Sequence, residues 1–220
     1  MKKRFRNATF AAAVAAAFLG ASGAATAQNA KAAERSKIAM CIGCHNIPGY
    51  QASFPEVYKV PKIAGQNAKY IVAALTEYRK GERRHPSMDA IAASLTDQDM
   101  ADLAAYYEQL GKGPAAPADP GPPPADIAKL LAQANCASCH GKNFSTPIDP
   151  SYPKLAGQHA DYLYAALKAY QTDHNPRVGR SNAIMMGMAR PFTHAEIKAL
   201  AAYFSSLPGE VKTVQLDEFR

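Results

Sequence analysis

The sequence predicts an all-α protein built from two similar halves, and three observations lead to this prediction. The same five-residue pattern occurs at residues 41–45 and again at 136–140. The segments that follow each pattern repeat one another, with residues spaced by three and four as on one face of a helix. A proline-rich segment, 111–124, separates the two halves, and no stretch has the alternating pattern that is typical of a strand.

The repeated five-residue pattern is C-x-x-C-H, the attachment signature of c-type haem. Its two cysteines each form a thioether to one haem vinyl group, and the adjacent histidine reaches the iron from the same side. A shared zinc site is disfavoured, because four-cysteine zinc patterns are compact and these two motifs lie far apart in the sequence. We therefore predict two covalently attached haem c groups, held by Cys41, Cys44 and His45 in the first half and by Cys136, Cys139 and His140 in the second.

Residues 1–27 have the features of a secretory signal peptide. Four basic residues lie within the first six, an apolar run follows at 9–19, and Ala25-Thr26-Ala27 offers an A-x-A cleavage site. The apolar run is shorter than the roughly 20 residues that a membrane span needs, although an uncleaved anchor is the alternative. We expect cleavage near Ala27 and a periplasmic mature chain, because c-type haem is attached outside the cytoplasm in bacteria.

The net charge of the mature chain is small. The full chain holds 25 basic and 18 acidic residues, and four of the basic residues lie in the predicted signal, which leaves 21 − 18 = +3. This charge does not favour nucleic-acid binding, which needs a dense basic stripe. A mildly positive surface suits weak, salt-sensitive docking onto acidic patches of redox partner proteins.

The composition divides the chain into four segments. The linker should be an extended, semi-rigid spacer, because proline fixes φ and removes hydrogen-bond donors. Each flanking unit is small and buries a limited core by itself, so an attached macrocycle would supply the rest. The expected segments are a signal peptide at 1–27, a first haem domain at 28–110, a linker at 111–124 and a second haem domain at 125–220.

Helices are expected around both haem motifs. Thr96 with Asp99, and Thr193 with Glu196, have the spacing of a helix N-cap backed by an acidic third residue. The expected helices are 32–40, 67–80 and 97–110 in the first half, and 126–134, 159–172 and 194–207 in the second.

The sixth iron ligand decides the chemistry of each haem, since a methionine favours electron transfer whereas an open position permits catalysis. The repeat register selects Met88 and Met185, which each lie seven residues before the residue that precedes a capping threonine. Met186 is the nearest alternative to Met185. His85 is a rival to Met88, because it lies only three residues earlier.

Further residues near the motifs have two interpretations each. Met100 and Met188 are expected to be packing residues rather than ligands. Pro61 and Pro153 occupy matching places after the axial histidines, where a backbone carbonyl could accept the other ring proton of the histidine; a simple turn proline is the alternative. Four arginines upstream of the methionines are either exposed or paired with haem propionates, namely Arg83, Arg84, Arg177 and Arg180.

The sequence resembles the dihaem cytochrome c4 family over nearly the whole mature chain. The resemblance rests on the duplicated haem motifs, on P-K-[IL]-A-G-Q at 61–66 and 153–158, and on L-A-A-Y-[YF] at 103–107 and 200–204. It implies two tandem class I cytochrome c domains, each wrapped around one haem with His–Met ligation, and periplasmic electron transfer to a terminal oxidase.

Within that family the ligand is the methionine before the L-S element, which implies Met88 and Met185. Two features depart from the family pattern. The proline-rich linker leaves the packing of the two domains open, and the loop at 46–60 is longer than its counterpart in the second half.

Three functions are consistent with the sequence. The first is an electron carrier without substrate chemistry of its own, between a bc1-type complex or a dehydrogenase and a terminal oxidase. The second is the cytochrome subunit of a dehydrogenase complex. The third is a dihaem enzyme, such as a peroxidase or a thiosulfate dehydrogenase, which would need an open iron or an unusual ligand such as a further cysteine. We expect redox proteins as partners, no nucleic acid, and membrane association only through those partners.

Overall fold

The computed structural model describes residues 37–172 and 175–216. The predicted signal peptide lies outside these residues. The chain divides after Met40, and the unit from Cys41 to Arg220 holds both halves. About half of the described chain is helical and its strands are only two residues long, which confirms the predicted all-α fold. Within the described part of the chain, no helix is long and apolar enough to span a membrane.

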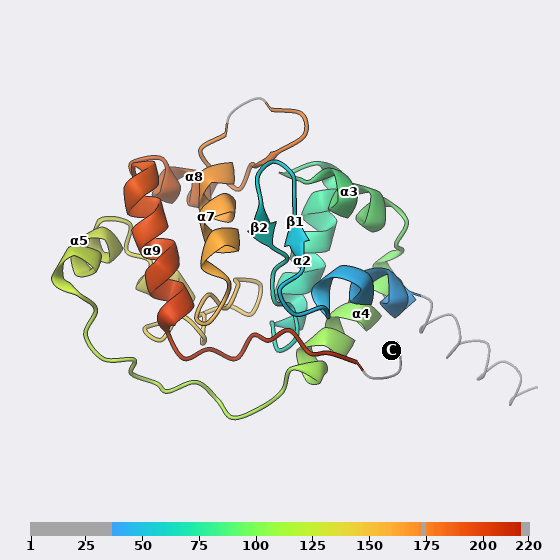
Figure 1. The fold of residues 1–220 in the computed structure, drawn as a ribbon, viewed down its shortest axis with the longest axis horizontal. Coiled ribbons are helices and arrows are strands. Elements are labelled where there is room, and N and C mark those ends of the chain that lie inside the picture. Colours follow the sequence, from blue (N-terminus) through green and yellow to red (C-terminus); the bar gives the residue numbers. More distant parts are fainter. Residues whose placement is uncertain (1–36, 173–174, 217–220) are drawn as a thin grey trace, which may run out of the picture. The chain divides into compact units, whose positions relative to one another are not determined.

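Each half contains a set of helices around its haem motif (Figure 1). Residues 41–45, which form the first motif, are helical. The first half continues with α2 (Ala68–Lys80), α3 (Pro86–Ala93) and α4 (Asp97–Leu110). The second half contains α5 (Ala125–Gln133), α6 (Ala137–His140), α7 (Ala160–Ala169), α8 (Ala183–Ala189) and α9 (His194–Ser206).

The last helix of each half begins at a capping box, as the sequence predicts. The Thr96 hydroxyl accepts a hydrogen bond from Asp99 N at 3.2 Å, and the Asp99 carboxylate accepts one from Thr96 N at 2.9 Å. Thr193 and Glu196 make the same pair of bonds at the start of α9. Each cap stabilises its helix by about 1 kcal/mol.

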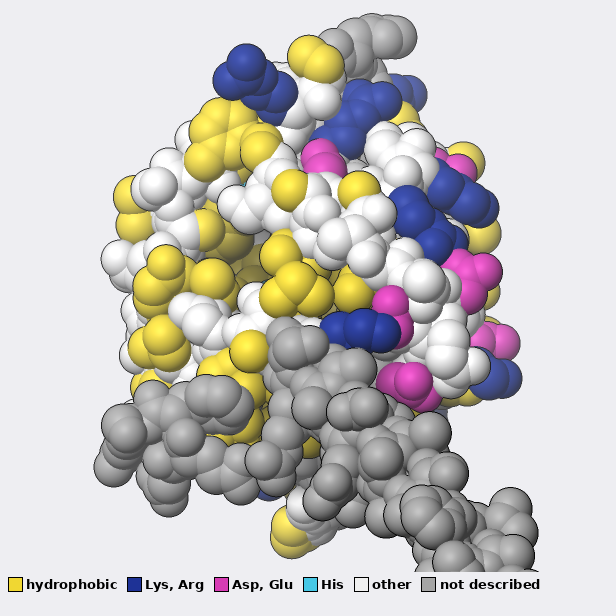
Figure 2. Space-filling view, turned by 90° about the vertical axis from the view of Figure 1, so that its right-hand side faces the viewer, with side chains coloured by type: hydrophobic (Ala, Val, Ile, Leu, Met, Phe, Trp, Pro, Cys, Tyr) yellow, Lys and Arg dark blue, Asp and Glu magenta, His cyan; other side chains and the backbone are white. Residues whose placement is uncertain are grey.

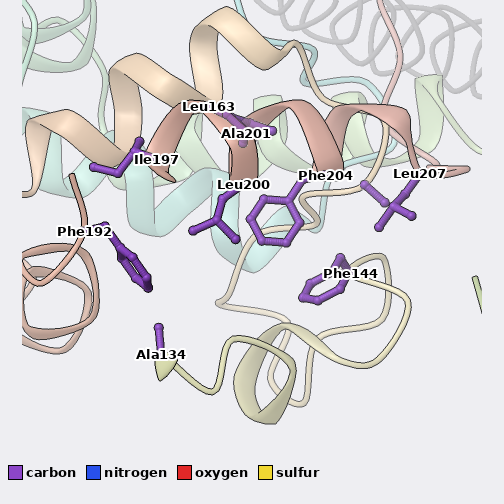
Figure 3. Close-up of a cluster of buried hydrophobic side chains, with 10 residues drawn as sticks. Ala134, Phe144, Leu163, Phe192, Ile197, Leu200, Ala201, Phe204 and Leu207 are labelled. Carbon is purple, nitrogen blue, oxygen red and sulfur yellow. The ribbon is translucent and has the colours of Figure 1, made fainter. Parts of the chain in front are cut away.

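The hydrophobic core of the second half lies where α9 crosses α7 (Figure 3). Phe144, from the loop after the haem motif, packs against Phe204 of α9 with ring centroids 4.8 Å apart. In the first half, Met100 is only 1 % exposed, which confirms its interpretation as a packing residue. The core cluster consists of Ala134, Phe144, Ala156, Leu163, Phe192, Ile197, Leu200, Ala201, Phe204 and Leu207.

Short strands are present that the sequence did not predict. A hairpin pairs β1 (Gln51–Ala52) with β2 (Tyr58–Lys59), and β3 (Arg83–Arg84) of the first half pairs antiparallel with β4 (Gly179–Arg180) of the second. A strand of two residues is too short to leave an alternating pattern in the sequence.

The two halves pack against each other through their repeated P-K-[IL]-A-G-Q segments. Lys154 N donates to Gln66 Oε1 at 3.0 Å, and Gln66 Nε2 donates to Lys154 O at 3.1 Å. Lys62 N and O make the equivalent bonds with Gln158, at 2.9 and 2.8 Å. This reciprocal exchange is typical of a two-fold interface. The proline-rich linker therefore does not keep the halves apart.

The linker and the C-terminal segment add two further connections. The linker forms no helix or strand before residue 125, as expected, but Ala116 N donates to Glu210 Oε1 at 3.0 Å. After α9 the chain returns to the first half (Figure 1), where Lys212 N donates to Ala64 O at 2.8 Å and Asn46 Nδ2 to Val214 O at 2.6 Å.

The long loop of the first half also contacts the second half. Lys59 N, on β2, donates to the carboxylate of Asp161 at 3.0 Å. Glu56 forms an ion pair with Lys168 of α7 at 2.5 Å. Tyr58 is buried, with its ring 6.2 Å from that of Tyr162. The extra residues in this loop thus lengthen the interface between the halves.

Candidate haem sites

The first haem motif places its histidine so that one ring nitrogen is held and the other is free to bind a metal. His45 Nδ1 lies 2.9 Å from Pro61 O, so the ring nitrogen donates to this carbonyl. Burial lowers the pKa of His45, although the bond to Pro61 acts in the opposite direction. A neutral imidazole with a fixed Nδ1–H presents Nε2 as a lone pair, which is the form that binds iron.

The second motif has the same arrangement. His140, which is 8 % exposed, donates from Nδ1 to Pro153 O at 3.1 Å. Burial lowers the pKa of His140 as well. The interpretation of Pro61 and Pro153 as carbonyl partners of the two histidines is therefore confirmed.

None of the four cysteines forms a disulfide bond, and each is partly exposed. Burial and the nearby Cys44 raise the pKa of Cys41 to about 11, and burial raises the pKa of Cys136. Reactive C-x-x-C redox pairs have the opposite property, a lowered pKa and a stable thiolate. The described residues also contain no group of three or more His, Cys, Asp or Glu side chains that could hold a metal ion. The donor sets thus fit thioether attachment better than a thiol redox centre or a zinc site.

The proposed methionine ligands occupy the same position in two short helices. Met88 is the third residue of α3 and Met185 the third residue of α8, and each helix follows an extended N-cap residue. Met186 is the fourth residue of α8, and all three methionine side chains are partly buried. Met188 is 42 % exposed, so the expectation that it is a packing residue is wrong: α8 is short and this side remains open.

Neither of these two helices was predicted from the sequence. Pro86 at the first position of α3 is a recognisable start signal. Asn182 caps α8, with its side chain accepting a bond from Met185 N at 3.1 Å. The equivalent residue of the first half, His85, makes no such cap, and its buried Nδ1 has no hydrogen-bond partner within the described chain.

One face of the molecule is suited to a large apolar group. Figure 2 shows hydrophobic side chains around a hollow in this face, with Lys and Arg side chains near its border. A macrocycle with an apolar body and charged carboxylates matches this combination of surfaces.

Two helical halves, each with a C-x-x-C-H motif and an oriented histidine, define a dihaem c-type cytochrome. The cytochrome c family model matches the chain twice, at residues 30–111 and 124–208. The fold is therefore a tandem of two cytochrome c domains, and the chain carries two covalently attached haem c groups.

Individual proteins that are similar to this chain indicate a more specific family within the cytochromes c. Cytochrome c4 of Azotobacter vinelandii is 30% identical, over 86% of this chain and 94% of its own length. The crystal structure of reduced cytochrome c4 from Pseudomonas stutzeri matches with a TM-score of 0.58 and 28% identity, over 80% of this chain and 97% of that chain. The chain belongs to the dihaem cytochrome c4 family and is an electron carrier of that type.

A relative with a more specific name also matches. The thiosulfate dehydrogenase electron acceptor of Stutzerimonas stutzeri is 31% identical, over 80% of this chain and 82% of its own length. Its name describes an electron acceptor of a thiosulfate dehydrogenase, which fits the second function considered from the sequence.

Proposed function

We propose that each half holds one haem through two thioethers and a histidine–methionine pair. In the first half the thioethers form at Cys41 and Cys44, with His45 and Met88 as axial ligands. In the second half they form at Cys136 and Cys139, with His140 and Met185 as axial ligands. The bound iron would supply one-electron chemistry, alternating between the ferrous and ferric states.

The matched environment of the two histidines is the observation that carries this proposal. The carbonyls of Pro61 and Pro153 fix the same tautomer in both halves and increase the basicity of the ligating nitrogen. The register of α3 and α8 adds support, because it gives Met88 and Met185 equivalent positions. Two irons with both axial positions occupied suit electron transfer, whereas an enzyme would need one iron with a vacant axial position.

The proposed cellular role is a periplasmic carrier in the respiratory chain. The predicted signal peptide supports export, and the carrier would pass single electrons from a bc1-type complex or a dehydrogenase to a terminal oxidase. Service to a dehydrogenase is the second candidate, and the likeness to a thiosulfate dehydrogenase electron acceptor favours it. Rates of reduction by a purified bc1-type complex and by a thiosulfate dehydrogenase would separate the two.

Replacement of single methionines tests the ligation. Met88→Ala and Met185→Ala should each remove one of two methionine–iron charge-transfer bands, open that iron to carbon monoxide, and lower the reduction potential of that haem, because a neutral thioether favours ferrous iron. Met186→Ala is the matched control, one position further along α8, and should keep both bands.

The opposite results have clear meanings. A loss of the band in Met186→Ala but not in Met185→Ala would shift the register by one residue. If the unmodified protein already binds carbon monoxide at one haem, that iron is open and the proposal of a pure electron carrier is overturned.

A further inference from the structure

The C-terminal segment crosses from the second half of the chain back to the first (Figure 1). Its described part consists of residues 209–216, which follow α9 and form no helix. The cytochrome c family model matches the second half only up to residue 208. The segment therefore lies beyond the residues that match a cytochrome c domain, and its contacts with the first half need an explanation of their own.

Backbone contacts hold this segment against the first P-K-[IL]-A-G-Q copy. Lys212 N donates to Ala64 O at 2.8 Å, and the two residues form an antiparallel bridge. A Cβ on Gly65 would lie 2.5 Å from Glu210 O, so only a glycine allows the two backbones to approach this closely. Val211 is buried. The segment is thus packed into the first half.

The far end of the segment reaches the first haem motif. Asn46 directly follows the histidine of this motif, donates from Nδ2 to Val214 O at 2.6 Å, and accepts from the Tyr107 hydroxyl at 2.8 Å. Both Asn46 and Tyr107 are buried. Burial raises the pKa of Tyr107, and the nearby Cys41 raises it further. Hydrogen bonds therefore join the segment to two side chains that lie at the histidine and beside the first cysteine of the motif.

The second half has a different residue at each of these two positions. Gly141 stands at the position of Asn46, directly after the histidine of the second motif. Phe204, the last residue of the second L-A-A-Y-[YF] copy, stands at the position of Tyr107. Neither residue offers a polar side-chain group. The polar pair thus occurs in the half that receives the C-terminal segment, which indicates that the pair and the segment act together.

We propose that the C-terminal segment is a cover for the first haem site, which acts through Asn46 and Tyr107 to exclude water and to raise the reduction potential of the first haem alone. The inference deepens the proposed electron transfer and rests on haem attachment at Cys41 and Cys44, but it does not depend on Met88 or on a particular donor. Ferric haem carries one more positive charge than ferrous haem, and a charge is less stable where water is excluded. Burial around a haem therefore favours the reduced state.

Replacement of Lys212 by proline tests the cover in the holoprotein. Lys212→Pro removes the N–H that bonds Ala64 O, because proline has no amide hydrogen. Lys212→Ala is the matched control, since it removes the same side-chain charge and keeps this N–H. Hydrogen exchange followed by mass spectrometry reports whether residues 209–216 are released. A redox titration followed by NMR gives the potential of each haem from the methyl signals of that haem.

The cover predicts an effect on one haem. In Lys212→Pro the segment should exchange faster, and the reduction equilibrium of the first haem should fall roughly threefold, which is about 28 mV for a one-electron couple. The potential of the second haem should not change. Asn46→Ala, which removes the partner of Val214 and leaves the backbone of the segment intact, should also lower the potential of the first haem. Lys212→Ala should change neither the exchange nor the potentials.

Three results would overturn the inference. The first is faster exchange of the segment in Lys212→Pro while the potential of the first haem is unchanged or higher. The second is an equal shift of both haems, which would indicate a general loosening of the interface. If Lys212→Pro does not accumulate or does not release the segment, Asn46→Ala decides, and an unchanged potential of the first haem in that variant is the third. The methionine–iron bands are read in the same samples, so an error in the proposed ligation is recognised separately.

Discussion

Gln66 and Gln158 are expected to hold the two halves together, and their removal gives a measurable loss of stability. Each side chain exchanges two hydrogen bonds with the backbone of a lysine in the other half, and each is 3 % exposed. Gln66→Ala would leave the partly buried N–H and C=O of Lys154 without these partners. At about 1 to 3 kcal/mol for each of these two unsatisfied groups, the free energy of unfolding should fall by about 2 to 6 kcal/mol.

The reciprocal geometry makes the prediction sharper. Gln158→Ala removes the equivalent pair of bonds to Lys62 and should cost about the same as Gln66→Ala. The double variant should cost less than the sum, because the first substitution already loosens the interface that the second glutamine supports.

Urea unfolding followed through the Soret band measures these effects. Gln98→Ala is the control, since Gln98 bonds Asp102 on the exposed side of α4 and should cost within about 0.5 kcal/mol. In the double variant we expect two separate transitions, one for each half. Equal stabilities for Gln66→Ala and Gln98→Ala would refute the assignment of the interface.

Two further predictions concern the segments that join the halves. Limited proteolysis should cut the exposed linker at 112–124 and leave two fragments with one haem each. These fragments should elute together from gel filtration, because the interface holds them, and should separate only in the Gln66/Gln158 double variant. Separate elution of the cut, otherwise unmodified protein would contradict the interface. Burial raises the pKa of Glu210, but bonds from Lys154 and Ala116 outweigh this and hold that pKa below 4.5. The stability contributed by Glu210 is therefore present above about pH 4.5 and is lost as the pH falls. In Glu210→Gln the free energy of unfolding, measured in urea, should fall less between neutral and acid pH than in the unmodified protein. An equal fall in both proteins would show that the ion pair contributes nothing.

Local features of this protein could be predicted from its sequence. The capping boxes at Thr96 and Thr193 involve residues three apart, so spacing alone identifies them. The carbonyl partners of the two histidines were predicted from the matching positions of Pro61 and Pro153. The repeat was informative here because each feature occurs twice in the same local context.

Features that join distant residues could not be predicted in the same way. The P-K-[IL]-A-G-Q segments were visible as a repeat, but nothing in them indicates that Gln66 binds the other copy rather than its own half. The proline content of the linker fixes the conformation of the linker itself, and says nothing about contacts elsewhere between the halves. The return of the C-terminal segment to Ala64 uses backbone hydrogen bonds, which leave no residue pattern.

The contacts between the halves are of two kinds, and they have different consequences. The reciprocal ones, at Gln66 and Gln158, follow from the duplication and treat both halves alike. Other contacts exist once, among them those of the hairpin at 51–59 and of the C-terminal segment. Asn46, directly after the first haem histidine, shows the effect, since it accepts a bond from the Tyr107 hydroxyl at 2.8 Å and donates to the C-terminal segment.

The second half has a glycine at the position that corresponds to Asn46. Gly141 has φ +77°, and a Cβ there would lie 2.1 Å from the carbonyl oxygen of Thr146, so no larger residue fits without moving the backbone. The two haem motifs thus begin from the same five-residue pattern but continue into different surroundings, one tied to the C-terminal segment and one to its own loop. Elements that occur once, such as the C-terminal segment, give the two haems different surroundings and can therefore make them differ in potential or partner.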